Sequence, residues 1–560
     1  MVFFFFTRTL VAVEDYLSQL NKAQQEPTTH VDGPLMVIAG AGSGKTRVLT
    51  YRIAYLMQQG IDAFSILALT FTNKAAREMK TRIAEIVGES ESKNLWMGTF
   101  HSVFARILRA ESDRLGYPSS FTIYDTQDSE RLVKSIIKEM NLDTDIYKPK
   151  QIRNRISSFK NSLITVRAYH NNPELVEADR EARRSAMGNI YKNYVERCFK
   201  AGAMDFDDLL LKTNELLNRF PDVLAKYQDR FRYILVDEYQ DTNHAQYKVT
   251  QLLSQKHRNL CVVGDDAQSI YSFRGADISN ILNFQSDYSD AHQVPLEQNY
   301  RSTKSILKCA DSIIKKNEKQ LEKTLWTEKE YGEPIILLEN YDERDEANRV
   351  AQYIQKVKGQ EGLNFNDFAV LYRTNYQSRV LEEAFRRHKI DYQLIGGLSF
   401  YQRKEIKDVL AYLKLLVNPY DETNLIRIIN EPSRGIGQKS INDIRASARK
   451  DSIKVWDLLE QVEETTIYRP AKQRIREFVD MMNSFRDSLD AQAPLHQLTR
   501  ELLDKSGYMK MLIDEQTHES LMRRENILEF INAISYYEKQ QKNPSLSAFL
   551  QEISLITDSD

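Results

Sequence analysis

Cysteine is scarce in this chain, which has only three among its 560 residues. Cys198, Cys261 and Cys309 lie far apart and form no CxxC pair, so the spacing of a zinc ribbon or an iron–sulfur site is excluded. Such sparse use of cysteine is typical of a reducing compartment, and we expect the protein to be cytoplasmic.

A strong charge of either sign is missing as well. Lys and Arg number 77 and Asp and Glu number 79, so the formal net charge is only −2. The chain therefore lacks the overall positive charge of a typical basic nucleic-acid binder. Any nucleic-acid site must be a local groove.

No hydrophobic run near the start of the chain is long enough to span a bilayer. The apolar runs Phe3–Phe6 and Leu10–Val13 flank Arg8, and they are short and lack the charge-first pattern of a signal peptide. We therefore expect no membrane partner, and we interpret residues 1–14 as a disordered leader.

The length is too great for one hydrophobic core, and at about 150 residues per domain it predicts roughly three to four structural units. Hydrophobic residues make up 42% and charged residues 28%, which is ordinary for a folded protein. No repeat, low-complexity tract or Pro/Gly-rich linker marks a boundary, so domain limits depend on changes of pattern alone.

Short apolar runs rich in Val, Ile and Leu recur between helix-like stretches, as buried parallel strands do. A first set lies at Leu35–Ala39, Ile66–Phe71, Tyr233–Val236 and Leu260–Val263. A second set lies at Ile335–Leu338, Phe368–Tyr372 and Tyr392–Ile395. The pattern predicts an α/β protein with two parallel-sheet layers.

Two strand-poor, helical stretches interrupt these layers. We therefore predict a first α/β domain at 15–128 and 201–294 with a helical insertion at 129–200. The first part of a second α/β domain follows at 295–397, and its helical insertion at 398–560.

The segment from Leu35 to Thr46 combines an apolar strand, a turn of small residues and the start of a helix, which is the form of a P-loop. Backbone N–H groups of the turn and helix would face the phosphates, Lys45 would reach their β- and γ-oxygens, and Thr46 would bind Mg²⁺. The strict pattern has a glycine where Ala39 stands, but a small residue suffices there. The expected phosphate-binding residues are Ala39, Gly40, Ala41, Gly42, Ser43, Gly44, Lys45 and Thr46.

Two carboxylates follow the apolar strand Tyr233–Val236, at the end of a strand where parallel sheets bind ligands. Asp237 would hold Mg²⁺, while Glu238 would orient and deprotonate the water that attacks the γ-phosphate. An Asp-Glu pair after a strand is weak evidence alone. With a P-loop upstream it predicts an ATP hydrolase.

Further motifs occur in one order along the chain, and together they resemble the UvrD/Rep/PcrA branch of superfamily 1 helicases. The resemblance extends from about Leu20 to the chain end. Its segments are Thr70–Met79, Gly98–Ser102, Asp205–Leu210, Ile234–Asn243, Val263–Gly275, Gln298–Ser302, Leu371–Arg379 and Gly396–Ile406.

This resemblance implies two RecA-like motor domains, each with an all-helical insertion. It implies ATP-driven 3′ to 5′ movement along single-stranded DNA and unwinding at single/double-strand junctions, in DNA repair or replication. ATP and Mg²⁺ are the implied cofactors, and protein partners are not indicated.

The family's functional residues transfer to matching positions here. Gln24 would read the adenine edge with Arg47 nearby, and Tyr300 would stack on the base. Gln268 and Arg301 would meet the γ-phosphate, and Arg274 would connect that contact to the DNA. The expected DNA-binding residues are the aromatic Phe71, Phe206, Tyr271 and Phe273 and the polar Thr72, Asn73, Lys74, His101, Arg373 and Asn375.

Two later motifs of the family are missing from these 560 residues: one of the His-Ser-Ala-Lys-Gly-Leu kind, and one supplying a second γ-phosphate arginine. We therefore expect an incomplete second motor domain in a chain that binds ATP but turns it over slowly and unwinds poorly. One alternative is the helicase subunit of a recombination nuclease, which would need a nuclease region. Another is a non-catalytic DNA- or partner-binding module that ATP switches.

Overall fold

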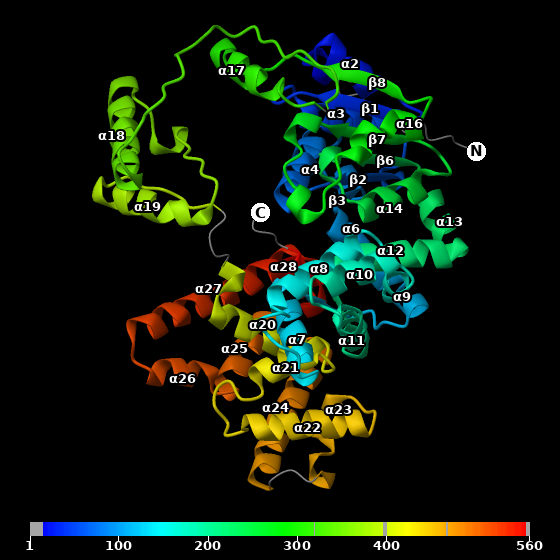
Figure 1. Ribbon diagram of the computed structural model, residues 1–560, viewed down its shortest axis with the longest axis vertical. Helices are drawn as coiled ribbons and strands as arrows, with labels where there is room; N and C mark the ends of the chain where they lie inside the picture. The colour runs from blue at the N-terminus through cyan, green and yellow to red at the C-terminus, as the bar shows by residue number, and fades with distance from the viewer. Residues whose placement is uncertain (1–14, 319, 396–399, 466–468, 556–560) are drawn as a thin grey trace, which may run out of the picture.

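The computed structural model describes residues 15–318, 320–395, 400–465 and 469–555 (Figure 1). The predicted leader at 1–14 and the Gly396–Ser399 part of the last motif lie outside the described residues. No helix in the described part of the chain is both long and apolar enough to cross a membrane.

A six-stranded parallel sheet is the centre of the first motor domain. Its strands lie in the order β3-β2-β6-β7-β1-β8, and every pairing between neighbours is parallel. The carboxyl ends of all six strands therefore meet at one edge of the sheet. The strands are β1 (Leu35–Ala39), β2 (Ile66–Thr70), β3 (Trp96–Thr99), β6 (Tyr233–Val236), β7 (Leu260–Gly264) and β8 (His292–Leu296).

The four strands of the first predicted set are confirmed, within one residue at their ends, whereas β3 and β8 were not predicted. Both missed strands lie at the edges of the sheet, where burial is less complete and the apolar signal is weaker. In β8 the residues alternate between exposed and buried, and Pro295 is tolerated because an edge strand has one unpaired side.

Helices cover both faces of the sheet, and alternate residues of each strand enter different cores. In β1, Leu35 and Val37 join one buried cluster, whereas Met36 and Ile38 join the other. This burial on both faces explains the continuous apolar runs.

The main helices are α2 (Lys22–Thr29), α3 (Lys45–Gln58), α4 (Asn73–Val87), α6 (Phe100–Ala110), α12 (Phe206–Arg219), α13 (Pro221–Arg230) and α14 (His244–Ser254), with the short α1 (Asp15–Ser18), α5 (Glu89–Ser92), α15 (Ser279–Leu282) and α16 (Phe284–Asp287).

A first helical lobe interrupts this domain and has a hydrophobic core of its own. A two-stranded parallel sheet of β4 (Thr122–Tyr124) and β5 (Ala203–Asp205) lies where the chain leaves the motor domain and returns to it. The lobe contains α7 (Thr126–Glu139), α8 (Pro149–Asn161), α9 (Val166–His170), α10 (Pro173–Glu181) and α11 (Met187–Lys200).

A second helical lobe is built around α20 (Lys404–Val417), which is buried along nearly its whole length. It fills the lower part of the molecule and packs beside the first lobe (Figure 1). Its other helices are α21 (Glu422–Ile428), α22 (Gln438–Lys450), α23 (Val455–Glu460), α24 (Arg469–Asp490), α25 (Leu495–Lys505), α26 (Tyr508–Asp514), α27 (His518–Gln540) and α28 (Leu546–Ser554).

The second predicted set of strands is not formed among the described residues, where no strand follows Leu296. The part between the sheet and the second lobe contains α17 (Lys304–Ile314) and a small unit of α18 (Glu343–Glu361) packed on α19 (Ser378–Arg387). The apolar runs expected as strands lie exposed, with Leu337 84% and Leu371 94% accessible. A strand needs a neighbouring strand for its N–H and C=O groups, and these runs have none in the described structure.

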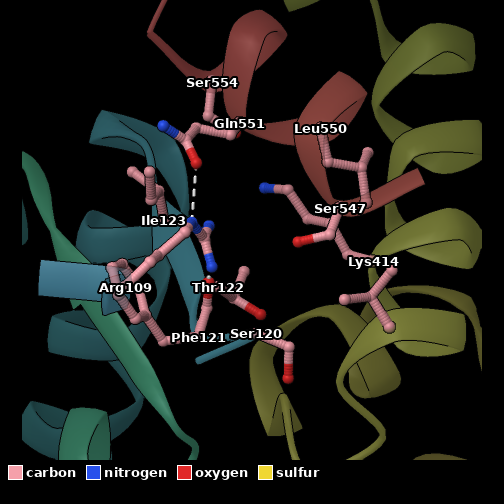
Figure 2. A pocket seen from close by; sticks show the side chains of 11 residues that line it. Arg109, Ser120, Phe121, Thr122, Ile123, Lys414, Ser547, Leu550, Gln551 and Ser554 are labelled. Atoms are coloured by element: carbon pink, nitrogen blue, oxygen red, sulfur yellow. Dashed lines mark hydrogen bonds between the residues drawn. The ribbon is translucent and has the colours of Figure 1, made fainter. Parts of the chain in front are cut away.

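Polar contacts with buried members join the second lobe to the first lobe and to the motor domain. Lys414 on α20 bonds to Asp128 on α7 at 3.0 Å, and Asn418 donates to the carbonyl of Ala201 at 2.8 Å. Figure 2 shows a small pocket at this junction, where Arg109 on α6 donates to the Gln551 side chain on α28. These contacts hold the second lobe against elements far earlier in the chain.

The pair Lys414–Asp128 provides a test of this packing. Burial would lower the pKa of Lys414, but the nearby carboxylates, Asp128 first, outweigh it and raise this pKa above its ordinary value. Lys414→Met keeps the apolar stem but leaves the buried Asp128 unpaired, so it should lower the free energy of unfolding by about 3–5 kcal/mol in urea titrations. Lys93→Met, which removes the exposed pair with Glu89, should cost at most about 1 kcal/mol. Equal losses in the two variants would contradict this account.

Candidate nucleotide and DNA site

The P-loop has the backbone that its sequence predicts. It joins β1 to α3, which begins at Lys45, and both Gly42 and Gly44 have left-handed φ angles, +67° and +89°. A side chain at either glycine would be strained, because residues other than glycine rarely adopt this region. The Ser43 hydroxyl donates to the carbonyl of Gly40 at 2.7 Å and closes the turn. The surface of the turn is therefore formed by its backbone.

The two carboxylates expected at the site lie at the same edge of the sheet as the P-loop. Asp237 is 4% exposed, and its N–H donates to the carbonyl of Leu69 on β2 at 2.9 Å. Glu238 has a left-handed φ of +50°, an unfavourable conformation for a glutamate that turns its side chain toward Lys45. One Glu238 oxygen lies 3.6 Å from Lys45 Nζ, so the two motifs meet directly.

The charges of Lys45, Asp237 and Glu238 at this edge of the sheet are not fully balanced by one another. Burial, and then the charge of Glu238, raise the pKa of Asp237 to about 7. Lys45 Nζ is buried and donates no hydrogen bond to the described residues. A buried ammonium and a destabilised carboxylate side by side fit a site for a phosphate group with a divalent cation.

Gln268 lies in the turn that follows β7, after the carboxyl end of that strand, and is held by an ionic chain. Its side-chain amide donates to Asp265 at 2.6 Å. The other Asp265 oxygen lies 2.8 Å from Lys323 Nζ, which also pairs with Asp266. Lys323 comes from the extended segment after α17, so this segment fixes the orientation of Asp265 and, through it, of Gln268.

The residues expected to meet the adenine lie on α2 and in the segment after β8. Gln24 is buried, and its amide donates to the Ser43 carbonyl at 2.8 Å and accepts from the N–H of Asn21 at 3.2 Å. Tyr300 is 45% exposed, and its hydroxyl accepts from the Asn21 side chain at 2.7 Å. In this structure Gln24 braces the P-loop, and the ring of Tyr300 is the accessible surface beside it.

The segment after β8 crosses the P-loop. Asn299 donates to the carbonyl of Ala41 at 2.6 Å, and the N–H of Tyr300 donates to the carbonyl of Gly42 at 2.9 Å. Leu325 lies so close to Gly40 that a Cβ there would fall 2.0 Å from its side chain. Arg301 is exposed beside Gly42, and Arg47 is exposed in the first turn of α3. The glycines of the loop thus allow close approach of a second chain segment.

A row of aromatic rings lies on the same domain. The ring centroids of Phe71 and Tyr271 are 5.0 Å apart, and those of Tyr271 and Phe273 are 6.0 Å apart. Phe273 is 74% exposed. The guanidinium of Arg274 lies 5.3 Å from the Tyr271 ring and 5.6 Å from the Phe273 ring, so Arg274 is part of this row.

His101 and Phe206 form a second aromatic pair, edge to face, with centroids 5.5 Å apart. Burial lowers the pKa of His101 to about 4, so the imidazole is neutral at ordinary pH. His101 therefore offers a neutral ring and one N–H rather than a positive charge for a phosphate.

The structure does not bring every expected DNA residue to this surface. Arg373 and Asn375 are exposed on the small unit of α18 and α19, which lies apart from the parallel sheet (Figure 1). Asn73 donates to the carbonyl of Leu555 at 2.8 Å, at the end of the second lobe. Thr72 caps α4 through a bond from Ala75 N–H, and Lys74 is exposed.

Sequence reasoning assigned no role to Lys323, Asn299 or Leu325, which lie on the nucleotide edge. Asn299 lies within the Gln298–Ser302 motif, whereas Lys323 and Leu325 belong to no glycine-rich or acidic pattern, and Lys323 is one lysine in a charged stretch. Only the path of the chain shows that they meet the P-loop and Asp265.

The neutral state of His101 gives a test by pH. The folded pKa of about 4 lies below the ordinary 6.5, so the unfolded chain binds a proton that the folded chain excludes. The contribution of His101 to stability is therefore full above pH 6.5 and is lost as pH falls toward 4, by roughly 1–3 kcal/mol for this partly exposed ring. In urea titrations over this range, His101→Gln should lose less stability than the unaltered protein. The exposed His518→Gln should follow the unaltered protein, and parallel curves for all three would contradict the prediction.

Comparison with known proteins matches both halves of the chain to one family. The model described as the UvrD/REP helicase N-terminal domain matches residues 20–289, and that described as the UvrD-like helicase C-terminal domain matches residues 294–560. Because the second match extends to residue 560, it does not support the expected incompleteness of the second motor domain.

Relatives with curated names agree with the family match. A protein of Staphylococcus aureus named ATP-dependent DNA helicase PcrA is 43% identical over 550 residues, covering 97% of this chain and 74% of the relative. A protein of Staphylococcus epidermidis with the same name is 44% identical over 548 residues, with the same coverage. The chain therefore belongs to the UvrD/REP helicase family and is an ATP-dependent helicase.

Proposed function

We propose that this chain is a DNA helicase that uses ATP hydrolysis to move 3′ to 5′ along single-stranded DNA and to open single/double-strand junctions. The observation that supports it best is the convergence of Lys45, Asp237 and Glu238 at one sheet edge, on the domain that carries the exposed aromatic row. The direction of movement, the cytoplasmic location and a role in repair or replication come from the family resemblance and composition.

In the proposed site, Gly40 to Gly44 hold the phosphates through backbone N–H groups, and Lys45 leaves Glu238 to bind the β- and γ-oxygens. Mg²⁺ would be held by the Thr46 hydroxyl and Asp237 together with phosphate oxygens. The described residues contain no cluster of three His, Cys, Asp or Glu for a metal, which agrees with an ion that the nucleotide completes. Gln24 and Tyr300 would define the adenine end, with Arg47 at its margin.

Hydrolysis needs a base for water and positive charge for the γ-phosphate. Glu238 is the proposed base, because its strained backbone directs its carboxylate to Lys45. Gln268 would orient the water or γ-phosphate, with Asp265 fixing its amide. Arg301 would stabilise the charge of the transition state, and such an arginine increases the rate by roughly a thousandfold or more.

Single-stranded DNA would stack on Phe71, Tyr271, Phe273 and Phe206. Aromatic faces accept every base, which suits movement regardless of sequence. Thr72, Asn73, Lys74, His101, Arg373 and Asn375 are the proposed polar contacts to the backbone. Contacts to phosphate fix the position of a strand without reading its sequence.

For this chain we propose ATP binding with slow turnover. The predicted strands of the second motor domain have no β-partner among the described residues, so no sheet of that domain positions Arg301. An arginine that is loosely positioned contributes less to the transition state than one that is fixed in place.

The first test is steady-state ATP hydrolysis with and without single-stranded DNA. We expect a low basal rate that DNA increases, and a loss of hydrolysis of about a hundredfold or more in Lys45→Ala because the charge on the β- and γ-oxygens is lost. Lys22→Ala, on the surface of α2, is the control and should behave as the unaltered chain. DNA affinity that changes with nucleotide in the absence of any turnover would instead support the ATP-switched binding module.

The second test addresses the aromatic row by fluorescence anisotropy with a labelled oligothymidylate. Phe273→Ala should weaken binding by roughly 5- to 100-fold because one stacking contact is lost, whereas Phe273→Trp should bind at least as tightly as the unaltered chain. Phe64→Ala removes an exposed ring outside the row and should have no effect. Equal affinities for Phe273→Ala and Phe64→Ala would show that the row does not bind DNA.

A further inference from the structure

Asn161, the last residue of α8 in the first helical lobe, is bonded to two segments of the motor domain and lies near a third. Its side chain hydrogen-bonds to Asn243 and to Asp207. Its Cβ lies 3.8 Å from where a Cβ of Gly275 would stand. Asn243 ends the loop that begins with Asp237, Asp207 lies in the first turn of α12 after Phe206, and Gly275 follows the aromatic row, so each segment belongs to a different part of the site.

The two hydrogen bonds use opposite ends of one amide. Asn243 Nδ2 donates to Asn161 Oδ1 at 2.7 Å, and Asn161 Nδ2 donates to Asp207 Oδ1 at 2.8 Å. Asn161 Nδ2 also bonds to the Ser157 carbonyl one turn earlier, at 3.0 Å, which fixes the amide on the helix. A single planar group therefore joins the loop that ends at Asn243 to the first turn of α12, and neither can turn without breaking a bond.

Lys160, the residue before Asn161, also holds the segment around Phe206. Lys160 Nζ is fully buried and binds Asp205 at 2.7 Å and Asp208 at 2.8 Å. Lys160 and Asn161 thus hold the carboxylates on both sides of Phe206. A ring between two anchored neighbours keeps a fixed position at the start of α12.

Asn243 connects Asn161 to the loop that begins at Asp237. Asn243 Oδ1 accepts from the N–H of Gln246 and caps α14, so its Nδ2 remains for Asn161. The preceding Thr242 carbonyl accepts from the N–H of Asp277 at 2.9 Å. The loop that begins at Asp237 is thereby tied to the chain following the aromatic row.

We propose that Asn161 is a positioning residue that couples the nucleotide loop ending at Asn243 to the aromatic side chains that bind DNA. The proposal rests on the proposed function, since it assigns Asn161 a role between the two sites that this function requires. Asn161 itself touches neither ligand. It acts by keeping Asn243 and Asp207 in one arrangement, beside Gly275.

The test measures coupling by binding alone, so it does not depend on turnover. The affinity of a labelled oligothymidylate is measured with and without Mg²⁺ and a non-hydrolysable ATP analogue, and the ratio is the coupling factor. Asn161→Leu removes both hydrogen bonds, and Asn161→Asp places two carboxylates against each other. Burial and the charge of Asp205 raise the pKa of Asp207 to about 6 in the unaltered chain, and the added carboxylate of Asn161→Asp raises it further, so the affinities are compared well above that pH.

We expect both variants to reduce the coupling factor by roughly 2- to 30-fold. The affinities for DNA alone and for the analogue alone should stay near those of the unaltered chain. The double variant Asn161→Asp with Asp207→Asn exchanges donor and acceptor and should restore coupling, which a general loss of stability would not do. Asn193→Leu, on α11 of the same lobe, removes a bond to the Asn189 carbonyl and a long one to Met140 Sδ, neither of which reaches the motor domain, and is the control.

The outcomes separate the two proposals. Failure of the unaltered chain to bind the oligonucleotide or the analogue would overturn the proposed function. Binding of both with a coupling factor of one, or coupling that survives in Asn161→Leu and Asn161→Asp, would overturn the role of Asn161. Loss of coupling in the exchanged double variant, at unaltered melting temperature, would also contradict it.

Discussion

The contact between Lys45 and Glu238 depends on one topological constraint, the parallel direction of all six strands. Since every carboxyl end meets the same edge, the P-loop after β1 and the acidic pair after β6 converge although β7 lies between their strands. Helices on both faces make this sheet rigid. A strand in the opposite direction would move one motif to the far edge and abolish the site.

At the same edge of the sheet, the pairing of Lys45 with the carboxylates can change when a ligand binds. Lys45 is opposed by Glu238, and Asp237 is held in a form that binds a proton readily near neutral pH. Phosphate attracts the ammonium, and a divalent cation stabilises the ionised carboxylates. Nucleotide binding would therefore rearrange Glu238 and its loop. That loop ends at Asn243, whose side chain is bonded to the first helical lobe.

The sequence predicted the parts of the fold that have a strong local signal. The strands buried on both faces, the P-loop and the Asp237–Glu238 pair could be located because burial and phosphate binding require particular residues at fixed spacing. The edge strand β8 was missed because its burial alternates around Pro295. Roles assigned through the family resemblance, such as those of Gln24 and Arg301, remain proposals. Contacts made by ordinary residues, Lys323 and Asn161 among them, follow from the path of the chain and could not be predicted.

The most direct measurement is a crystal structure of this chain with Mg²⁺ and a non-hydrolysable ATP analogue. The account predicts that Lys45 Nζ leaves Glu238 and lies within hydrogen-bond distance of the β- and γ-phosphate oxygens, with Mg²⁺ bound to Thr46 and in contact with Asp237 directly or through water. A nucleotide bound elsewhere, or one bound at the P-loop with Lys45 still paired to Glu238, would contradict it.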